Sequence, residues 1–190
     1  MKTLLAKVAP DATDMIRADH TRVVAMFHRY KHDVAPATQQ ALAASICLAI
    51  EVHAQIEEEI FYPAMGSVDV GLVGKLIPEH DRMRSLIAAL RNQSPGDAAY
   101  DATLMDLMRE VMHHVADEET ILLPQAERAL GERLGDLGAR MMRRRLELMA
   151  PHAGEIARNK ARALPKTNFV LAAAGVIGGL LLMRHVRRAF

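Results

Sequence analysis

The chain has 190 residues, of which 51% are hydrophobic and only 4% aromatic, with no Trp. This length allows one full hydrophobic core, and abundant Ala, Leu, Met and Arg favour helices over sheets. Cys47 is the only cysteine, which excludes a disulfide framework and a cysteine-based zinc site and is typical of a reducing compartment.

The net charge of +1 hides an asymmetry along the chain. Residues 1–132 carry 12 basic and 20 acidic side chains, whereas residues 133–190 carry 12 basic and 3 acidic ones. We therefore predict an acidic domain followed by a basic segment. The apolar run before Lys7 is too short for a secretory signal, so we expect the domain to be cytoplasmic.

Four segments of helical length fill residues 1–130, separated by Pro36, Pro63, the loop 93–97 and Gly131. Each segment repeats its core-facing residues in steps of three and four, which is typical of a helix in a bundle. The four stripes comprise Ile16, His20, Val23, Phe27 and Tyr30; Ile46, Ile50, His53, Glu57 and Ile60; Leu76, His80, Met83, Ile87 and Leu90; and Leu104, Leu107, Val111, His114, Glu118 and Ile121. Short connections predict an all-α fold, an antiparallel four-helix bundle. Pro78 interrupts the third stripe, so we expect a kink or a helix start there.

The C-terminal third divides into three parts. Residues 131–167 predict a basic helix ending near Pro151 and a charged linker, residues 168–184 a short apolar helix, and residues 185–190 a basic tail. The uncharged run within the apolar helix would span about 22 Å against a hydrocarbon core of about 30 Å.

Two interpretations of the apolar helix stay open. It anchors the protein to the inner face of a membrane, with snorkelling Lys166 and Arg184 side chains, or it packs on the bundle or on a second chain. Gly175 and Gly179 form a Gly-x-x-x-Gly pair that would let two such helices approach closely in a homodimer. The arginines lack a recognised nucleic-acid module, so no nucleic-acid partner is expected.

One motif occurs twice in the first 130 residues. Residues 53–63 and 114–124 both read His-x-x-x-Glu-Glu-x-Ile-x-x-Pro, and "DHTR" at 19–22 resembles "EHDR" at 79–82. The bundle is therefore predicted to consist of two copies of one helical hairpin, each supplying a His and then a His-x-x-x-Glu. Residues four apart lie on the same helix face, so each His and Glu of the longer motif points into the core.

Six core-facing polar residues need a partner that the core itself does not offer: His20, His53, Glu57, His80, His114 and Glu118. An unpaired buried carboxylate costs several kcal/mol, and bound cations satisfy such a group of nitrogens and oxygens. Without thiolates, the ligand set favours Fe, Mn or Zn. Two-fold symmetry suggests two metals, one on each pair of histidines, with the two glutamates and a solvent-derived oxo or hydroxo group as bridges. One coordination position would remain for a diatomic ligand.

Several neighbours have competing interpretations. His113 is an alternative ligand to His114, although the repeat and the core stripe favour His114. Glu58 and Glu119 lie about 100° around the helix from the predicted ligands and are expected in solvent. A ferritin-like site requires two Glu-x-x-His motifs, and the chain has one, at Glu110 and His113.

Three further residues lie near the first stripe. His28 and His32 are off it and are expected on the surface. Tyr30 is on it and is expected in the core, where its hydroxyl would be near the site.

The six residues, in this order and spacing, resemble the hemerythrin-like or HHE cation-binding family over residues 11–130, with Pro63 and Pro124 closing the second and fourth helices. The resemblance implies a four-helix bundle with a non-haem di-iron centre that binds oxygen. The family's invertebrate oxygen carriers have His-x-x-x-His on the third helix, whereas Arg84 stands four residues after His80 here. The set of four His and two Glu is similar to that of the family's sensing and repair members.

The resulting hypothesis is a di-iron protein that binds dioxygen or a related diatomic as sensor, store or scavenger. The alternatives are a di-iron enzyme that acts on nitric oxide or peroxide or donates iron for cluster repair, and a protein in which a cation is stored or has a structural part.

Overall fold

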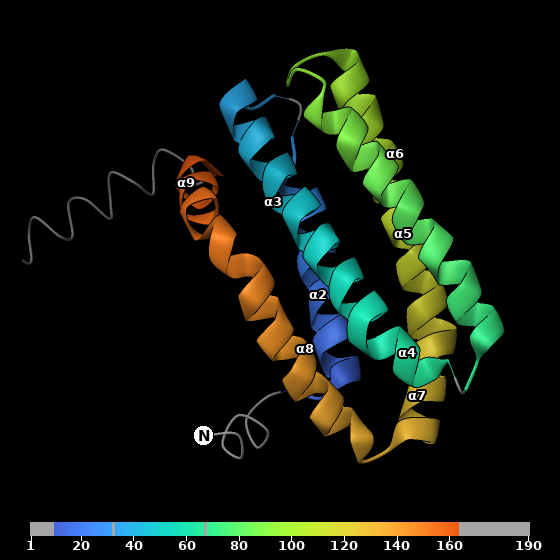
Figure 1. Cartoon of the computed structure of the whole chain (residues 1–190). Coiled ribbons are helices and arrows are strands. Elements are labelled where there is room, and N and C mark those ends of the chain that lie inside the picture. Colours follow the sequence, from blue (N-terminus) through green and yellow to red (C-terminus); the bar gives the residue numbers. More distant parts are fainter. Residues whose placement is uncertain (1–9, 32, 67, 164–190) are drawn as a thin grey trace, which may run out of the picture.

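The computed structural model describes residues 10–31, 33–66 and 68–163, and all regular structure in these ranges is helical (Figure 1). The longer helices are α2 (Ala12–Arg29), α3 (Pro36–Ile56), α5 (Val70–Arg91), α6 (Ala98–Asp117), α8 (Arg133–Met149) and α9 (Ala153–Ala163). The shorter elements are α4 (Tyr62–Met65), α7 (Leu123–Leu130), two π-helical turns, η1 (Glu57–Phe61) and η2 (Glu118–Leu122), and the 3₁₀ turn η3 (Ala150–His152).

Helices α2, α3, α5 and α6 lie side by side, and consecutive ones run in opposite directions (Figure 1). Local sequence sets their ends. The Asp11 carboxylate accepts a hydrogen bond from the Asp14 amide at 2.9 Å, and Asp69 caps α5 in the same way at 2.9 Å. Gly131 ends α7 with φ of 46°, a backbone conformation that favours glycine.

Helix α5 starts at Val70 and contains Pro78, so of the two expectations for Pro78 the helix start is wrong. The structure also differs from the sequence-based expectations at Pro63 and Pro124. Pro63 and Pro124 do not close their helices, because the chain remains helical through α4 and α7. A proline ring clashes with the carbonyl four residues earlier in a regular helix, and the wider π turn that ends two residues before Pro63 and Pro124 accommodates it.

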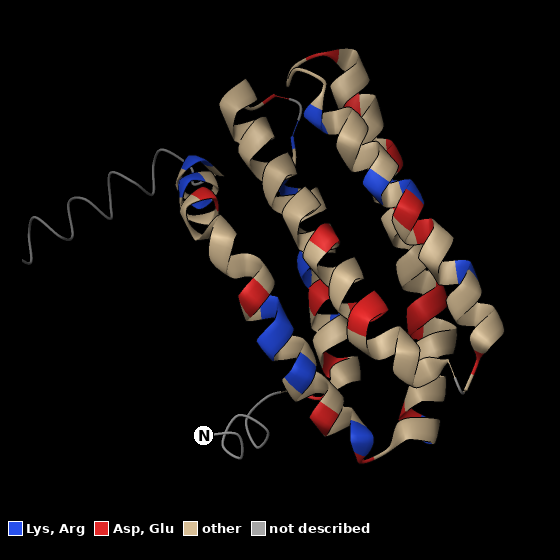
Figure 2. Ribbon diagram, viewed as in Figure 1, with Lys and Arg blue, Asp and Glu red and all other residues tan. Residues whose placement is uncertain are grey.

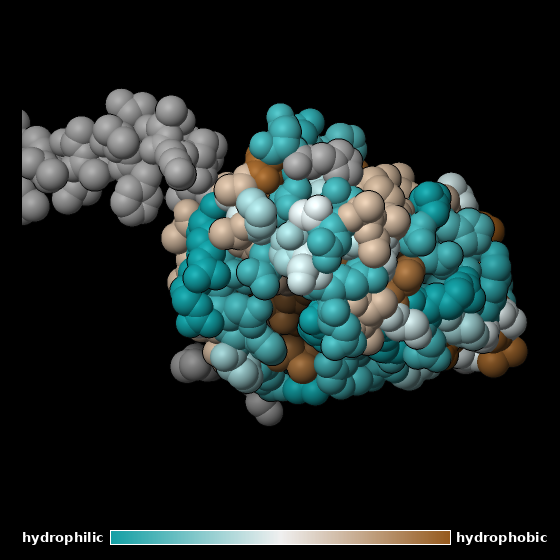
Figure 3. Space-filling model, turned by 90° about the horizontal axis from the view of Figure 1, so that it is seen from above, coloured by the Kyte–Doolittle hydropathy of each residue, from teal (hydrophilic) through white to brown (hydrophobic). Residues whose placement is uncertain are grey.

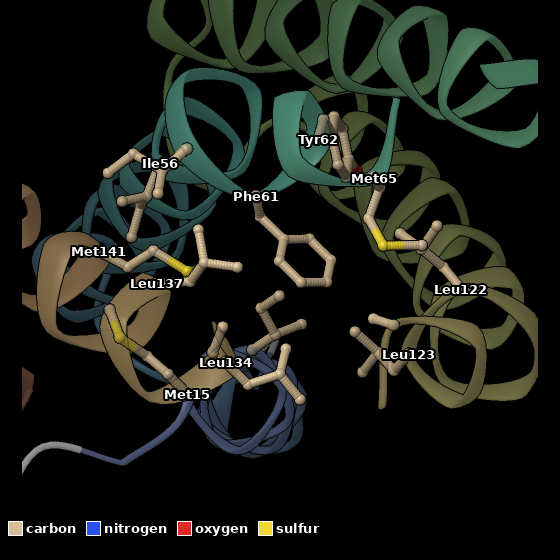
Figure 4. Packing of buried hydrophobic residues seen from close by; sticks show 14 of the residues in the cluster. Met15, Ile56, Phe61, Tyr62, Met65, Leu122, Leu123, Leu134, Leu137 and Met141 are labelled. Atoms are coloured by element: carbon tan, nitrogen blue, oxygen red, sulfur yellow. The ribbon is translucent and has the colours of Figure 1, made fainter. Parts of the chain in front are cut away.

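The described part of the basic C-terminal segment, residues 133–163, packs against the α2 and α3 side of the molecule (Figure 1). Leu134, Leu137 and Met141 of α8 are buried in the same cluster as Met15 and Phe61 (Figure 4). Residues 153–163, expected as linker, form α9 instead, which lies along α3. An apolar stripe on α8 explains this packing, because a helix buries such a face against its neighbours.

The buried core consists of two apolar clusters with a polar layer between them. Along α2, Ile16 belongs to one cluster, Val23 to the other, and His20 lies between them. The same alternation places His80 between Leu76 and Met83 on α5. The fold therefore holds its histidines at one level inside an otherwise apolar interior.

Charged residues occur along most of the helices, with several basic residues along α8 and α9 (Figure 2). From above, the surface is mainly hydrophilic, with apolar residues at the floor of a hollow (Figure 3). Within the described ranges, every helix is too short or too polar to cross a bilayer. The predicted apolar helix at 168–184, the Gly175–Gly179 pair, the tail 185–190 and His32 lie outside the described residues.

Candidate metal centre

The structure brings all six residues singled out in the sequence into the polar layer. His20 comes from α2, His53 from α3, His80 from α5 and His114 from α6. The two glutamates, Glu57 and Glu118, begin η1 and η2. All six side chains are buried, and both glutamates are 0% exposed.

Each glutamate lies between histidines of both hairpins. Glu57 Oε2 is 3.2 Å from Nε2 of His53 and 3.4 Å from Nε2 of His80. Glu118 Oε2 is 3.1 Å from Nε2 of His20 and 3.5 Å from Nε2 of His114. Two groups able to hold a metal ion result, and they share Glu57: His20, His53, Glu57 and Glu118, and Glu57, His80 and His114.

The outward nitrogen of every histidine faces a carboxylate. These Nδ1 contacts are His20 to Glu119 at 2.9 Å, His53 to Asp19 at 3.5 Å, His80 to Glu58 at 2.8 Å and His114 to Glu79 at 3.0 Å. A carboxylate oxygen accepts a proton there, so we assign the imidazole proton to Nδ1 and a lone pair to Nε2. All four lone pairs then point inward.

With these tautomers, the inward-facing atoms of the centre fit a bound cation. Nε2 of His80 lies only 3.1 Å from Nε2 of His114, where two lone pairs would repel each other. Within the described part of the chain, four inward atoms lack a hydrogen-bond partner: His20 Nε2, His53 Nε2, Glu57 Oε1 and Glu118 Oε2. Buried polar atoms are rarely left unpaired, and a positive ion between them would satisfy this set.

Two of these carboxylates lie where the sequence did not predict them. Glu58 and Glu119, which are expected in solvent, contact Nδ1 of His80 and Nδ1 of His20. Their side chains are 27% and 39% exposed. Asp19 and Glu79 each directly precede a buried histidine, and the acid of the repeated "DHTR" and "EHDR" is the sequence signal for them. Such outer partners orient the imidazoles and raise their basicity as ligands.

Two arginines hold two of these carboxylates in turn. Nη2 of Arg84 donates to both oxygens of Glu58, at 2.7 and 2.8 Å. The buried Arg145 of α8 forms an ion pair with Asp19. Arg84 therefore supports the orientation of His80 from the position four residues further along the chain, and α8 is connected to His53 through Asp19.

Tyr62 is the residue of the centre that the sequence analysis missed. Its ring stacks on His80, with centroids 5.6 Å apart, and its hydroxyl donates to Glu118 Oε1 at 2.9 Å. The same hydroxyl lies 3.5 Å from Glu57 Oε2. Burial raises the pKa of this phenol, as do the charges of both glutamates, so it remains a proton donor. The sequence pattern does not reveal the π turn before Tyr62, and that turn brings its side chain to the centre.

The remaining neighbours are outside the centre. The His113 side chain is 60% exposed, whereas His114 is buried. The Tyr30 hydroxyl donates to Asp101 at 2.6 Å, and His28 is exposed and contacts the Val24 carbonyl oxygen.

The two central glutamates have opposite protonation tendencies. Burial raises the pKa of Glu57 to about 7, and the adjacent charge of Glu118 adds to the rise. Burial favours neutral Glu118 as well, but His114 and His20 outweigh it and lower its pKa. Burial also lowers the pKa of His53 to about 4, which keeps that imidazole neutral. Near neutral pH, a proton and a cation therefore compete for Glu57.

The chain is similar to known proteins in sequence and in fold. The family model described as the hemerythrin HHE cation-binding domain matches residues 11–126. A DNA nickase from Nostoc sp. is 30% identical over 110 residues, which are 57% of this chain and 31% of that protein. The chain therefore matches less than a third of that relative's length.

A solved structure gives the fold comparison. It is the crystal structure of a hemerythrin HHE cation-binding domain-containing protein from Mycobacterium kansasii, with a TM-score of 0.64. The match has 18% sequence identity and covers 82% of this chain and 99% of that one. At this identity the likeness establishes the fold.

Proposed function

Because the chain belongs to the hemerythrin HHE cation-binding family, we propose that its helices form a four-helix bundle around two iron ions and that it binds dioxygen or a related diatomic. One ion would be held by His20 and His53 and the other by His80 and His114, with Glu57 and Glu118 as bridges. Mn or Zn suits the same nitrogen and oxygen donors. The protein would act as a sensor, store or scavenger.

The observation that carries this proposal is the direction of the four imidazoles. Each has a carboxylate on Nδ1, which leaves four Nε2 lone pairs facing two carboxylates inside the core. When bound, the iron pair would supply redox chemistry and a coordination position for a small ligand. The protein's own residues hold the ligands in orientation, and the apolar clusters on both sides limit the access of water.

The test is metal analysis and optical spectroscopy of protein purified in air. We expect two iron ions per chain, charge-transfer bands in the near ultraviolet, and a reversible spectral change when oxygen is removed and restored. A colourless protein with stoichiometric zinc would contradict the redox proposal. Iron with a spectrum that does not respond to oxygen or nitric oxide would contradict the diatomic ligand and leave metal storage.

Tyr62 favours a second candidate, an enzyme that reduces peroxide or nitric oxide with the same centre. Both reductions consume protons, and the Tyr62 hydroxyl is a buried donor 2.9 Å from Glu118. Tyr62→Phe keeps the ring on His80 and removes only the donor. We expect unchanged iron content with at least a tenfold loss of turnover. Equal turnover by both proteins would exclude this role for the hydroxyl.

The proposed location is the cytoplasmic face of a membrane, with residues 168–184 as the anchor. The support is the uncharged apolar run bracketed by Lys166 and Arg184. Removing residues 167–190 should move the protein from the membrane pellet to the supernatant. Full-length protein that stays in the supernatant without detergent would refute the anchor.

The Nostoc relative gives no ground for assigning DNA nicking to this chain, since the match covers 31% of that protein.

A further inference from the structure

A cavity lies outside the metal centre, between α2, α3, α8 and α9. Its volume is about 190 Å³. Most of its wall is apolar, formed by Val23, Met26, Leu48, Val52, Met149 and Ile156. A cavity of about 150 Å³ with such a lining binds benzene, so this one has room for a chain of roughly six carbons.

One end of the cavity is charged. Asp19, Arg22 and Arg145 all line it. Asp19 is buried and pairs with the buried Arg145, and its other oxygen lies 3.6 Å from Arg22, whose side chain is 58% exposed. Two guanidinium groups against one carboxylate leave an excess positive charge beside an apolar space.

We propose that this cavity binds a small amphipathic anion, an aliphatic carboxylate of about six carbons. The carboxylate would lie against Arg22 and Arg145, since guanidinium groups bind carboxylates well, and the chain would lie among the apolar side chains. Apolar lining with a few convergent polar groups is the usual form of small-molecule sites.

The site would be next to the metal centre without being part of it. Asp19 lines the cavity and also faces Nδ1 of His53 at 3.5 Å. The bound anion would therefore be separated from a metal-binding imidazole by a single side chain, and α8 and α9 would form half of its binding site.

The experiment is a titration of the full-length protein with sodium hexanoate, followed by NMR of ¹³C-methyl methionine. Met26 and Met149 line the cavity, whereas Met65 and Met83 are buried elsewhere in the core. We expect saturable shifts of the first pair only. Acetate has the same head group without the chain, and hexylammonium has the same chain with the opposite charge. Both should bind at least tenfold more weakly.

Two variants and a matched control test the location. Ala49→Phe should fill the cavity and abolish binding, while Ala44→Phe, on the same helix at a different cavity, should leave it intact. Arg22→Gln removes an exposed charge without disturbing the core and should weaken hexanoate binding by roughly five- to tenfold. Hexylammonium binding as tightly as hexanoate, no saturable shift, or binding that survives Ala49→Phe would each overturn the proposal.

Discussion

The first hairpin, residues 12–65, and the second, residues 70–130, supply the same kinds of residue to the candidate metal centre. They differ in the residues that surround it. Both supply a histidine from their first helix and a His-x-x-x-Glu from their second, and both have a π turn that starts at the glutamate. Both also place an acidic residue directly before the first histidine, where it faces Nδ1 of the second. The shared features are those that orient the inward lone pairs.

The differences lie around this common set. Tyr62 of the first hairpin corresponds to Leu123 of the second, and Arg84 of the second corresponds to Val24 of the first. Helices α8 and α9 cover the α2 and α3 side, and Arg145 reaches Asp19 from there. A two-fold repeat is thus enough to place the candidate ligands, while residues that differ between the hairpins give the two candidate ligand groups different surroundings.

The largest effect is expected when one candidate ligand histidine is removed from each hairpin, which tests whether both hairpins contribute to metal binding. His53→Ala and His114→Ala should each lower metal affinity about a thousandfold, because direct ligands contribute more than outer partners, which are worth about 10–100-fold. His113→Ala is the matched control and should retain its metal, since that side chain is 60% exposed. Metal content by mass spectrometry measures all three. Equal losses in His113→Ala and His114→Ala would disprove the inward role of His114.

Helix α8 packs on the α2 and α3 side, and this packing depends on a close approach of Gly138 to the backbone of Pro10. A Cβ there would lie 2.3 Å from the Pro10 carbonyl oxygen, which is backbone and cannot easily move. Gly138→Ala should therefore lower the free energy of unfolding by about 3 kcal/mol. Gly135→Ala on the same helix meets nothing within 4 Å and should raise it by about 0.5–1 kcal/mol. Denaturant unfolding of metal-free protein measures both. A stable Gly138→Ala protein would mean that α8 does not pack closely there.

The two glutamates, equivalent in the repeat, should respond differently to neutralisation. The pKa of Glu57 is raised to about 7 from 4.5, so the folded state binds the extra proton and loses stability as pH rises through this window. In metal-free protein at pH 8, Glu57→Gln should raise the free energy of unfolding by about 2 kcal/mol, and the gain should shrink as pH falls toward 4.5. Glu118→Gln should give no such gain, since the neighbouring histidines lower the pKa of Glu118. Identical pH profiles for the two variants would contradict the asymmetry.

The smallest expected effect concerns Arg84, which has no counterpart in the first hairpin. Arg84→Met should leave Glu58 less well held on His80 and weaken metal binding about tenfold. Arg91→Met is the control, because Arg91 lies on the same helix, is exposed and pairs with Glu51. Competition with a chromogenic chelator compares them. If both variants bind metal as the wild type does, Glu58 orients His80 without help from Arg84.

Much of the fold follows from local spacing. Steps of three and four residues predicted the helical segments of residues 10–130, and the four-residue spacing of His53 and Glu57 was enough to place both on a buried face. Helical periodicity is a property of the nearest turns, which is why it can be read without knowing the neighbours. The same logic predicted His114, rather than His113, as the inward residue.

The sequence by itself thus determined the helical segments of residues 10–130 and that six polar residues face the interior. Only the tertiary structure decided that Glu58 and Glu119 reach across to His80 and His20, that a π turn brings Tyr62 to Glu118, and that α8 and α9 pack on one hairpin. These contacts join residues on different helices or depend on a local change of helical pitch. They are set by how the helices pack against one another, and a periodicity confined to one helix contains no information about that packing.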